Sequence, residues 1–222
     1  MPGGGAEIFS LRLRRRHWPR KISARTWLSI HEQAHRLGVP TNATMLFGLD
    51  DTWPERVEHM LRLRQSQDRA PGYQCFIPLA FQPGEDRFVT HGPTPFVTLY
   101  VLALARIVLD NVPHLKSYWP ALGEAAAAAG LGYGADDMDG TLSEEKIMHS
   151  AGSPTPTGFA RRRMVEMIEL AGLEPVERDG AFNEARQRAD KGPGATHDRG
   201  GARGAGSGTQ GGVRRDQASD GA

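Results

Sequence analysis

The chain has 222 residues and a net charge of +1, with 27 Lys and Arg residues against 26 Asp and Glu residues. So small a charge gives no reason to expect nucleic acid or an anionic membrane as a partner. The longest apolar stretch, residues 96–109, is too short to span a bilayer, and no signal peptide opens the chain. A single cysteine, Cys75, excludes an internal disulfide and a metal site made only of cysteines. We therefore expect a soluble cytoplasmic protein.

Composition divides the chain into a folding unit and a tail. Between Ala181 and Ala222 there are ten glycines, and the only large apolar residues are Phe182 and Val213. Such a segment buries too little apolar surface to offset the entropy lost on ordering. We predict one domain over residues 1–179 and a disordered Gly- and Arg-rich tail over residues 180–222.

The opening segment combines three glycines, Gly3 to Gly5, with an acidic residue, Glu7. Glycine runs occur where the backbone turns tightly or approaches a ligand closely. A basic run, residues 12–16, follows, and such runs are mostly solvated faces. Ser23 is then a good N-cap for an amphipathic helix that ends at Gly38.

Strands and helices alternate along the rest of the domain. The predicted strands are residues 41–48, 73–81, 114–119 and 133–139, and the predicted helices are residues 52–67, 96–111, 124–129, 143–150 and 158–171, before a short extended segment at 174–178. Pro78 ends the second strand or introduces a bulge. This alternation is typical of βα units on a parallel sheet, and short apolar strands suit a barrel wall. Four such units are half of a (β/α)8 barrel, or somewhat more than half of a six-unit barrel.

Reacting groups of parallel barrels gather at the carboxyl ends of the strands and in the loops that follow. That rule selects Asn42, Thr44, Lys116, Tyr118, Asp137 and Asp139, together with His149 on the next helix. Lys116 lies in a short apolar strand, where an unpaired ammonium is costly, so we expect it to face a polar cavity. For the others a structural role is open: Asn42 and Thr44 could satisfy backbone groups, Tyr118 could be a core aromatic, and His149 a core or capping residue.

An acidic stretch at residues 134–141 is the most informative internal feature. Asp136, Asp137 and Asp139 repel one another unless a cation, hydrogen-bond donors or a substrate compensates them. One alternative is an exposed Asp-Gly turn followed by a helix cap. Another is a Mg²⁺ or Ca²⁺ site, although no second acidic cluster ends another strand.

Several long segments resemble one enzyme family. They are PGGGAEIF (2–9), AHRLGVPTNATMLFG (34–48), FIPLAF (76–81), ARIVLDNVPHLKSYW (105–119) and GADDMDGTLSEEKIMHSAG (134–152). In this order they resemble the second half of the menaquinone-pathway radical-SAM enzymes, which share a subfamily with the synthases of the deazaflavin cofactor. The DGT at 139–141 with its E-x-I-x-H-x-A-G continuation, and HLKSYW, favour aminofutalosine synthase over cyclic dehypoxanthinylfutalosine synthase.

The resemblance implies a fold and a mechanism. The fold is the C-terminal half of a radical-SAM (β/α) TIM-type barrel, covering residues 2–179. In the family a 4Fe–4S cluster on a CxxxCxxC loop cleaves S-adenosylmethionine, and the 5′-deoxyadenosyl radical adds to 3-[(1-carboxyvinyl)oxy]benzoate to form aminofutalosine. Gly4, Gly5 and Glu7 would bind S-adenosylmethionine. The seven barrel-mouth residues named above would bind the small-molecule substrate, with Lys116 facing a carboxylate.

The cluster motif is absent, because Cys75 cannot supply three thiolates. We therefore expect no cluster on this chain and no activity from it alone. A wrongly assigned start codon or a frameshift, a separate chain carrying the N-terminal half-barrel, or decay to a non-catalytic fragment would each account for this. Open alternatives are a related cyclic dehypoxanthinylfutalosine or deazaflavin-cofactor synthase. A half-barrel would also leave a sheet edge exposed.

Overall fold

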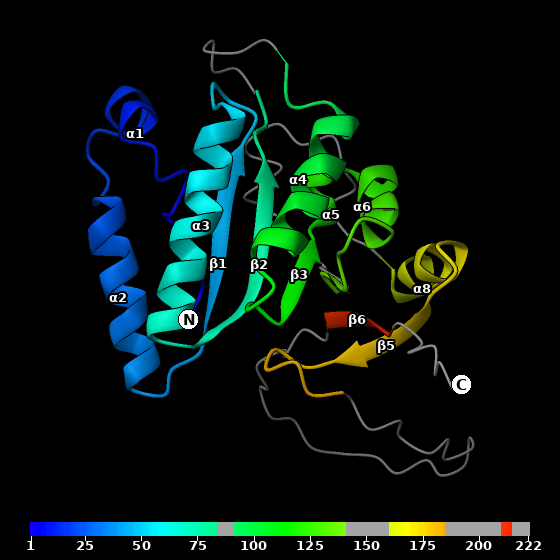
Figure 1. Ribbon diagram of the computed structural model, residues 1–222. Helices are drawn as coiled ribbons and strands as arrows, with labels where there is room; N and C mark the ends of the chain where they lie inside the picture. The colour runs from blue at the N-terminus through cyan, green and yellow to red at the C-terminus, as the bar shows by residue number, and fades with distance from the viewer. Residues whose placement is uncertain (84–90, 141–159, 185–209, 215–222) are drawn as a thin grey trace, which may run out of the picture.

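The computed structural model describes residues 1–83, 91–140, 160–184 and 210–214 (Figure 1). In chain order the elements are α1 (Leu11–His17), α2 (Ala24–Arg36), β1 (Thr41–Phe47), α3 (Trp53–Arg69), β2 (Tyr73–Ala80), α4 (Pro95–Val108), β3 (His114–Ser117), α5 (Trp119–Leu122), α6 (Glu124–Leu131), β4 (Asp137–Met138), α8 (Arg161–Leu170), β5 (Glu174–Arg178) and β6 (Gln210–Arg214). Within these described ranges no helix is long and apolar enough to cross a membrane.

The strands form one sheet in the order β1-β2-β3-β4-β6-β5. β1 to β4 are parallel to their neighbours, whereas β6 runs antiparallel to both β4 and β5. Figure 1 shows α3 and α4 in front of β1 and β2, and α6 also packs against β3. The predicted α/β class with a parallel sheet is confirmed. The sheet is open, so its identity as half of a barrel stays a prediction.

Local sequence signals explain where the helices begin. The Ser23 side chain accepts a hydrogen bond from the Thr26 N–H at 3.0 Å, and Thr52 and Glu55 form a capping box at the start of α3. α1 was not predicted: Ser10 caps it, and the arginine run forms its body. The fourth predicted strand shrinks to two residues because Gly134 turns the backbone at φ 103° before β4.

The hydrophobic core lies between the helices and one face of the sheet. Ala43, Met45 and Phe47 point into it from β1, and Met60 and Leu63 meet them from α3. All five are fully buried. Burying the methionine, phenylalanine and leucine side chains stabilises the fold by about 1.5–3 kcal/mol each, so this layer fixes which face of β1 looks away from the helices.

The opening segment, residues 1–9, covers the outer edge of β1. The carbonyl oxygens of Met1 and Glu7 accept hydrogen bonds from the amides of Asn42 and Leu46 at 3.0 Å and 2.8 Å. A half-barrel was expected to leave a sheet edge exposed, and at β1 the opening segment covers part of such an edge. The unpaired amides of an edge strand are satisfied by whatever backbone lies beside them.

Part of the predicted disordered tail is ordered. Residues 180–184 continue from β5, and Gln210–Arg214 forms β6 between β4 and β5. The prediction rested on low apolar content, but β6 is held by backbone pairing, which needs no apolar side chain. The rest of the tail lies outside the described residues.

Candidate functional site

The sheet surface that faces away from the helices collects the polar residues of the parallel strands. On β3, Leu115 joins the core and the Ser117 hydroxyl donates to the Ala127 carbonyl of α6, so Lys116 points to the opposite side. Lys116 pairs in register with Asp137, and Met138 faces the core. Asn42 and Thr44 lie on the same side of β1. We call this surface the site face.

A buried ionic cluster stands on the site face. The Lys116 ammonium contacts the carboxylate of Asp139 and lies 3.4 Å from Oδ2 of Asp137. Arg178, at the end of β5, donates from Nε and Nη2 to the two oxygens of Asp137, each at 2.6 Å. Lys116, Asp137 and Arg178 are each at most 3% exposed. Because a bidentate guanidinium–carboxylate pair is geometrically rigid, Arg178 fixes the position of Asp137.

The charges of this cluster support one another. Burial alone would lower the pKa of Lys116, but the carboxylates of Asp139 and Asp137 outweigh it and raise that pKa. Burial raises the pKa of Asp137, against the opposing effects of Arg178 and Lys116. Lys116 is therefore an ammonium at neutral pH. The repulsion expected within the acidic stretch is compensated by cations of the protein itself.

Asp136 does not belong to this cluster. Its carboxylate accepts hydrogen bonds from the Leu115 amide at 2.7 Å, from Arg106 at 2.8 Å and from His114 at 2.9 Å. Burial raises the pKa of Asp136, but these partners outweigh it and the net shift is downward. Asp136 thus joins β3 to α4 and has a structural role.

The structure bears on both alternatives for the acidic stretch, an exposed Asp-Gly turn and a Mg²⁺ or Ca²⁺ site. An exposed turn is wrong for Asp137, which is 1% exposed. Among the residues that the structure describes, no group of three or more His, Cys, Asp or Glu side chains could hold a metal ion. Asp139 remains the most accessible member of the cluster, with 13% of its side chain exposed.

Sequence reasoning missed Arg178 and Phe182. The Arg178 guanidinium lies 3.7 Å from the centre of the Phe182 ring, and that ring stacks on His114 at 4.0 Å. Asp179 holds the turn between them by accepting from the amides of Ala181 and Asn183. The sequence around Arg178 does not indicate its partner, because Asp137 lies 41 residues earlier in the chain.

The predicted S-adenosylmethionine segment lies beside β1. Gly3 is explained by packing, since an added Cβ would lie 2.4 Å from the Asn42 carbonyl oxygen. Gly4 is exposed, and apart from its chain neighbours no described residue lies within 4 Å of an added Cβ. Gly5 has φ 85°, which favours glycine. Glu7 is paired with Lys21, and its role in binding stays a prediction.

The predicted substrate residues differ in their surroundings. The Thr44 hydroxyl donates to the Gly3 carbonyl oxygen at 2.6 Å, which is a structural bond. The Asn42 Oδ1 atom is buried and has no hydrogen-bond partner among the described residues. Tyr118 is half-buried at the start of α5. His149 lies outside the described residues. The structure therefore brings Lys116, Asp137 and Asp139 into contact and places Asn42 and Thr44 on the same face.

A buried histidine connects the opening segment to β1. The Phe9 amide donates to Nδ1 of His59 at 3.1 Å, so Nε2 carries the proton and donates to the Thr44 carbonyl oxygen at 3.1 Å. Burial lowers the pKa of His59 to about 3, so its ring is neutral at pH 7. This residue was also not singled out in the sequence.

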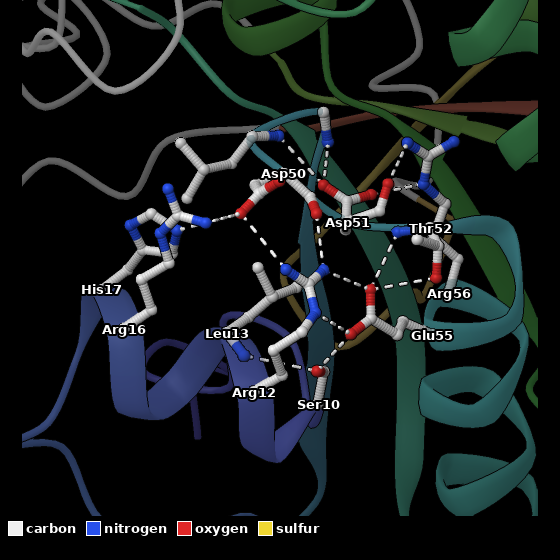
Figure 2. A network of polar contacts seen from close by, with 12 residues as sticks. Ser10, Arg12, Leu13, Arg16, His17, Asp50, Asp51, Thr52, Glu55 and Arg56 are labelled. Atoms are coloured by element: carbon white, nitrogen blue, oxygen red, sulfur yellow. Dashed lines mark hydrogen bonds and ion pairs between the residues drawn. The ribbon is translucent and has the colours of Figure 1, made fainter.

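The loop after β1 is held by a second polar network (Figure 2). Arg12 donates to Glu55 at 2.8 Å and 3.1 Å and to the Asp50 carbonyl at 2.7 Å, and Arg16 pairs with Asp50 at 2.9 Å. The hydrogen bond from Arg12 is the largest cause that lowers the pKa of Glu55 to about 2. The basic run was expected to be a solvated face. Arg12, Arg15 and Arg16 are exposed as expected, although Arg12 and Arg16 also pair with the loop carboxylates, whereas the expectation is wrong for the buried Arg14.

The chain does not fit an iron–sulfur cluster. Its one cysteine, Cys75, is fully buried on β2, and burial raises the pKa of its thiol, which disfavours the thiolate that binds iron.

Comparison with known proteins identifies the family. Residues 70–190 match the family model of the CofH/MqnC C-terminal region. The chain is 51% identical over 191 residues to the aminodeoxyfutalosine synthase of Thermus thermophilus, covering 84% of this chain and 51% of that protein. It is 38% identical over 177 residues to the cyclic dehypoxanthine futalosine synthase of Streptomyces coelicolor, covering 79% and 44%.

A third relative is named for a different activity. The 5-amino-6-(D-ribitylamino)uracil–L-tyrosine 4-hydroxyphenyl transferase of Archaeoglobus fulgidus is 35% identical over 186 residues, a match that covers 82% of this chain and 54% of the relative. The chain spans about half the length of the curated relatives it matches. The resemblance read from the sequence is confirmed, and the chain belongs to the CofH/MqnC family, whose C-terminal region lies at residues 70–190.

Proposed function

We propose that the chain is the substrate-binding half of an aminodeoxyfutalosine synthase. The identity of 51% to a relative of that name supports this reading, as does the ionic cluster on the site face. The observation that carries the proposal is the buried Lys116 ammonium, whose neighbour Asp139 is the accessible member of the cluster. A cation held in this way suits an anionic aromatic substrate such as 3-[(1-carboxyvinyl)oxy]benzoate.

In this proposal the residues of the chain bind and orient. A substrate carboxylate would take the place of the Asp139 carboxylate beside the Lys116 ammonium, while the two hydrogen bonds from Arg178 hold Asp137 in position. Asn42 offers an acceptor to a hydroxyl or amine of the ligand. S-adenosylmethionine, when bound near Gly4, supplies the 5′-deoxyadenosyl group that the substrate receives.

The radical-generating half comes from elsewhere in this proposal. The chain does not fit the cluster, so a segment or a separate chain with the N-terminal half-barrel must contribute it. A cyclic dehypoxanthine futalosine or deazaflavin-type reaction is the second candidate, supported by the relatives at 38% and 35% identity.

A complementation experiment tests the proposal. The chain is produced together with the part of the Thermus thermophilus relative that it does not cover, and the cluster is reconstituted without oxygen. The complex is supplied with S-adenosylmethionine and 3-[(1-carboxyvinyl)oxy]benzoate, and the product is identified from its mass by mass spectrometry. Aminofutalosine is expected. A product that lacks the carbon skeleton of the benzoate would contradict the assignment and favour the second candidate.

Lys116→Gln tests the role of the cation in the same complex. It is expected to raise KM for the benzoate about 30-fold, which corresponds to roughly 2 kcal/mol of lost charge-assisted binding. Lys116→Arg, which keeps the charge, should recover part of this loss. Arg162→Gln, on the exposed face of α8, is the control and should leave KM unchanged. An unchanged KM in Lys116→Gln would remove Lys116 from the site.

A further inference from the structure

A groove with an unusual concentration of cations lies on the helix side of the molecule. It has a volume of about 450 Å³ and lies between α1, the start of α2 and α3. Five of its lining residues are cationic, and among the described residues no Asp or Glu lines it: Arg14, Arg15, Lys21, Arg25 and Arg62. We call it the basic groove. It is separate from the site face, which looks away from the helices.

The cations of the basic groove are incompletely neutralised. Arg15 and Arg25 are exposed and form no ion pair with any described residue. Lys21 pairs with Glu7, and Arg62 lies 3.8 Å from Glu58, both carboxylates being outside the lining. Like charges that converge in a cleft raise the local potential and attract an anion.

One wall of the groove is aromatic. Trp18 and Phe9 both line it; Phe9 is buried, whereas Trp18 is half-buried, so part of its indole surface is accessible. Arginine guanidinium groups bind phosphate oxygens in a bidentate manner, and indole faces stack on flat rings. The volume lies within the range of roughly 300–1,000 Å³ typical of small-molecule sites.

We propose that the basic groove binds a small phosphorylated molecule with a flat ring, a nucleotide, through Arg15, Arg25 and Trp18. The phosphates lie against the two unpaired guanidinium groups, and the ring lies against the indole. All residues of this site belong to this chain, and the site is independent of the proposed function.

Titration calorimetry of the whole chain with ADP, pyrophosphate and adenosine tests the site. We expect ADP to bind most tightly, pyrophosphate more weakly and adenosine most weakly, with ADP affinity falling as salt is added. Arg15→Gln and Arg25→Gln should each weaken ADP and pyrophosphate about tenfold, because each removes one phosphate partner. Trp18→Leu should weaken ADP and leave pyrophosphate unchanged.

Arg162→Gln is the matched control, since Arg162 is an exposed arginine on α8 whose only carboxylate partner among the described residues is Glu166. It should leave all affinities unchanged. A Kd weaker than about 1 mM for both ADP and pyrophosphate at low salt would overturn the site. Equal weakening by Arg162→Gln would also overturn it, because the binding would then follow overall charge. Equal affinities for ADP and pyrophosphate would overturn the nucleotide assignment.

Discussion

Arg178 stabilises the site face through its ion pair with the Asp137 carboxylate. Its two hydrogen bonds to Asp137, each 2.6 Å long, leave the guanidinium and the carboxylate buried with side-chain exposures of 4% and 1%. Removing one member of a buried ion pair leaves the other charge without compensation. Among the described residues, Lys116 at 3.4 Å would then be the remaining cation beside Asp137.

Arg178→Met is therefore expected to lower the free energy of unfolding by about 3–5 kcal/mol. The double variant with Asp137→Asn should recover part of the lost free energy of unfolding, because it no longer has an unpaired buried carboxylate. Urea denaturation of the two variants measures both effects. The control is Arg162→Met, whose side chain is 91% exposed and should change stability by less than about 0.5 kcal/mol. A loss as small as that in Arg178→Met would show that the pair contributes little.

His59 predicts a stability that depends on pH. Its folded pKa, about 3, lies below the value of about 6.5 in the unfolded chain, so the folded state favours the neutral ring. This stabilisation is complete above pH 6.5 and is lost as the pH falls from about 6.5 toward 3, at about 1.4 kcal/mol per pH unit. His31, whose pKa burial lowers to about 4, adds to the slope.

Denaturation at a series of pH values between 7 and 4.5 measures this slope. His59→Gln should be less stable at pH 7 but lose less stability on acidification than the parent chain. His91→Gln, at an exposed position, should keep the parent slope. If His59→Gln and His91→Gln both keep the parent slope, protonation of His59 does not cause the pH dependence of stability.

The opening segment requires a glycine at position 3 in order to approach β1 closely. A Cβ at Gly3 would lie 2.4 Å from the Asn42 carbonyl oxygen, and backbone atoms of β1 cannot move aside as a flexible side chain could. The two backbone hydrogen bonds from Met1 and Glu7 to β1 lie on either side of Gly3, so a displacement of Gly3 would disturb both.

Gly3→Ala is expected to detach the segment from β1 and to speed the hydrogen exchange of the Asn42 and Leu46 amides. Gly4→Ala is the matched control, because an added Cβ there meets no protein atom within 4 Å. It should leave exchange at both amides unchanged. Equal exchange rates in the two variants would mean that the segment tolerates a wider separation.

For the molecule as a whole, the sequence predicted the repeating parts better than the site. The strands and helices from Thr41 to Val108 follow apolar patterns and caps within each segment, and they are confirmed to within a few residues. Lys116 was also recognisable, because an ammonium in an apolar strand requires a partner. Arg178, His59 and β6 could not be found in this way, since each is defined by a contact with a distant part of the chain.

The complete chain is expected to bind no iron after reconstitution with iron and sulfide. With one buried cysteine it cannot offer three thiolates, so the brown charge-transfer absorption of a cluster should be absent. Metal analysis and an absorption spectrum of the purified protein check this. A cluster at one per chain would contradict the interpretation of Cys75.

The separation of Asp137 and Arg178 along the chain also has a consequence for synthesis on the ribosome. The two residues are 41 positions apart, so Asp137 leaves the ribosome well before its guanidinium partner. At roughly 5–20 residues per second this delay lasts about 2–8 s. During that interval the Asp137 carboxylate on β4 lacks its guanidinium partner and is costly to bury. The sheet reaches its full order beside β4 later still, because β6, which pairs with both β4 and β5, is made after β5.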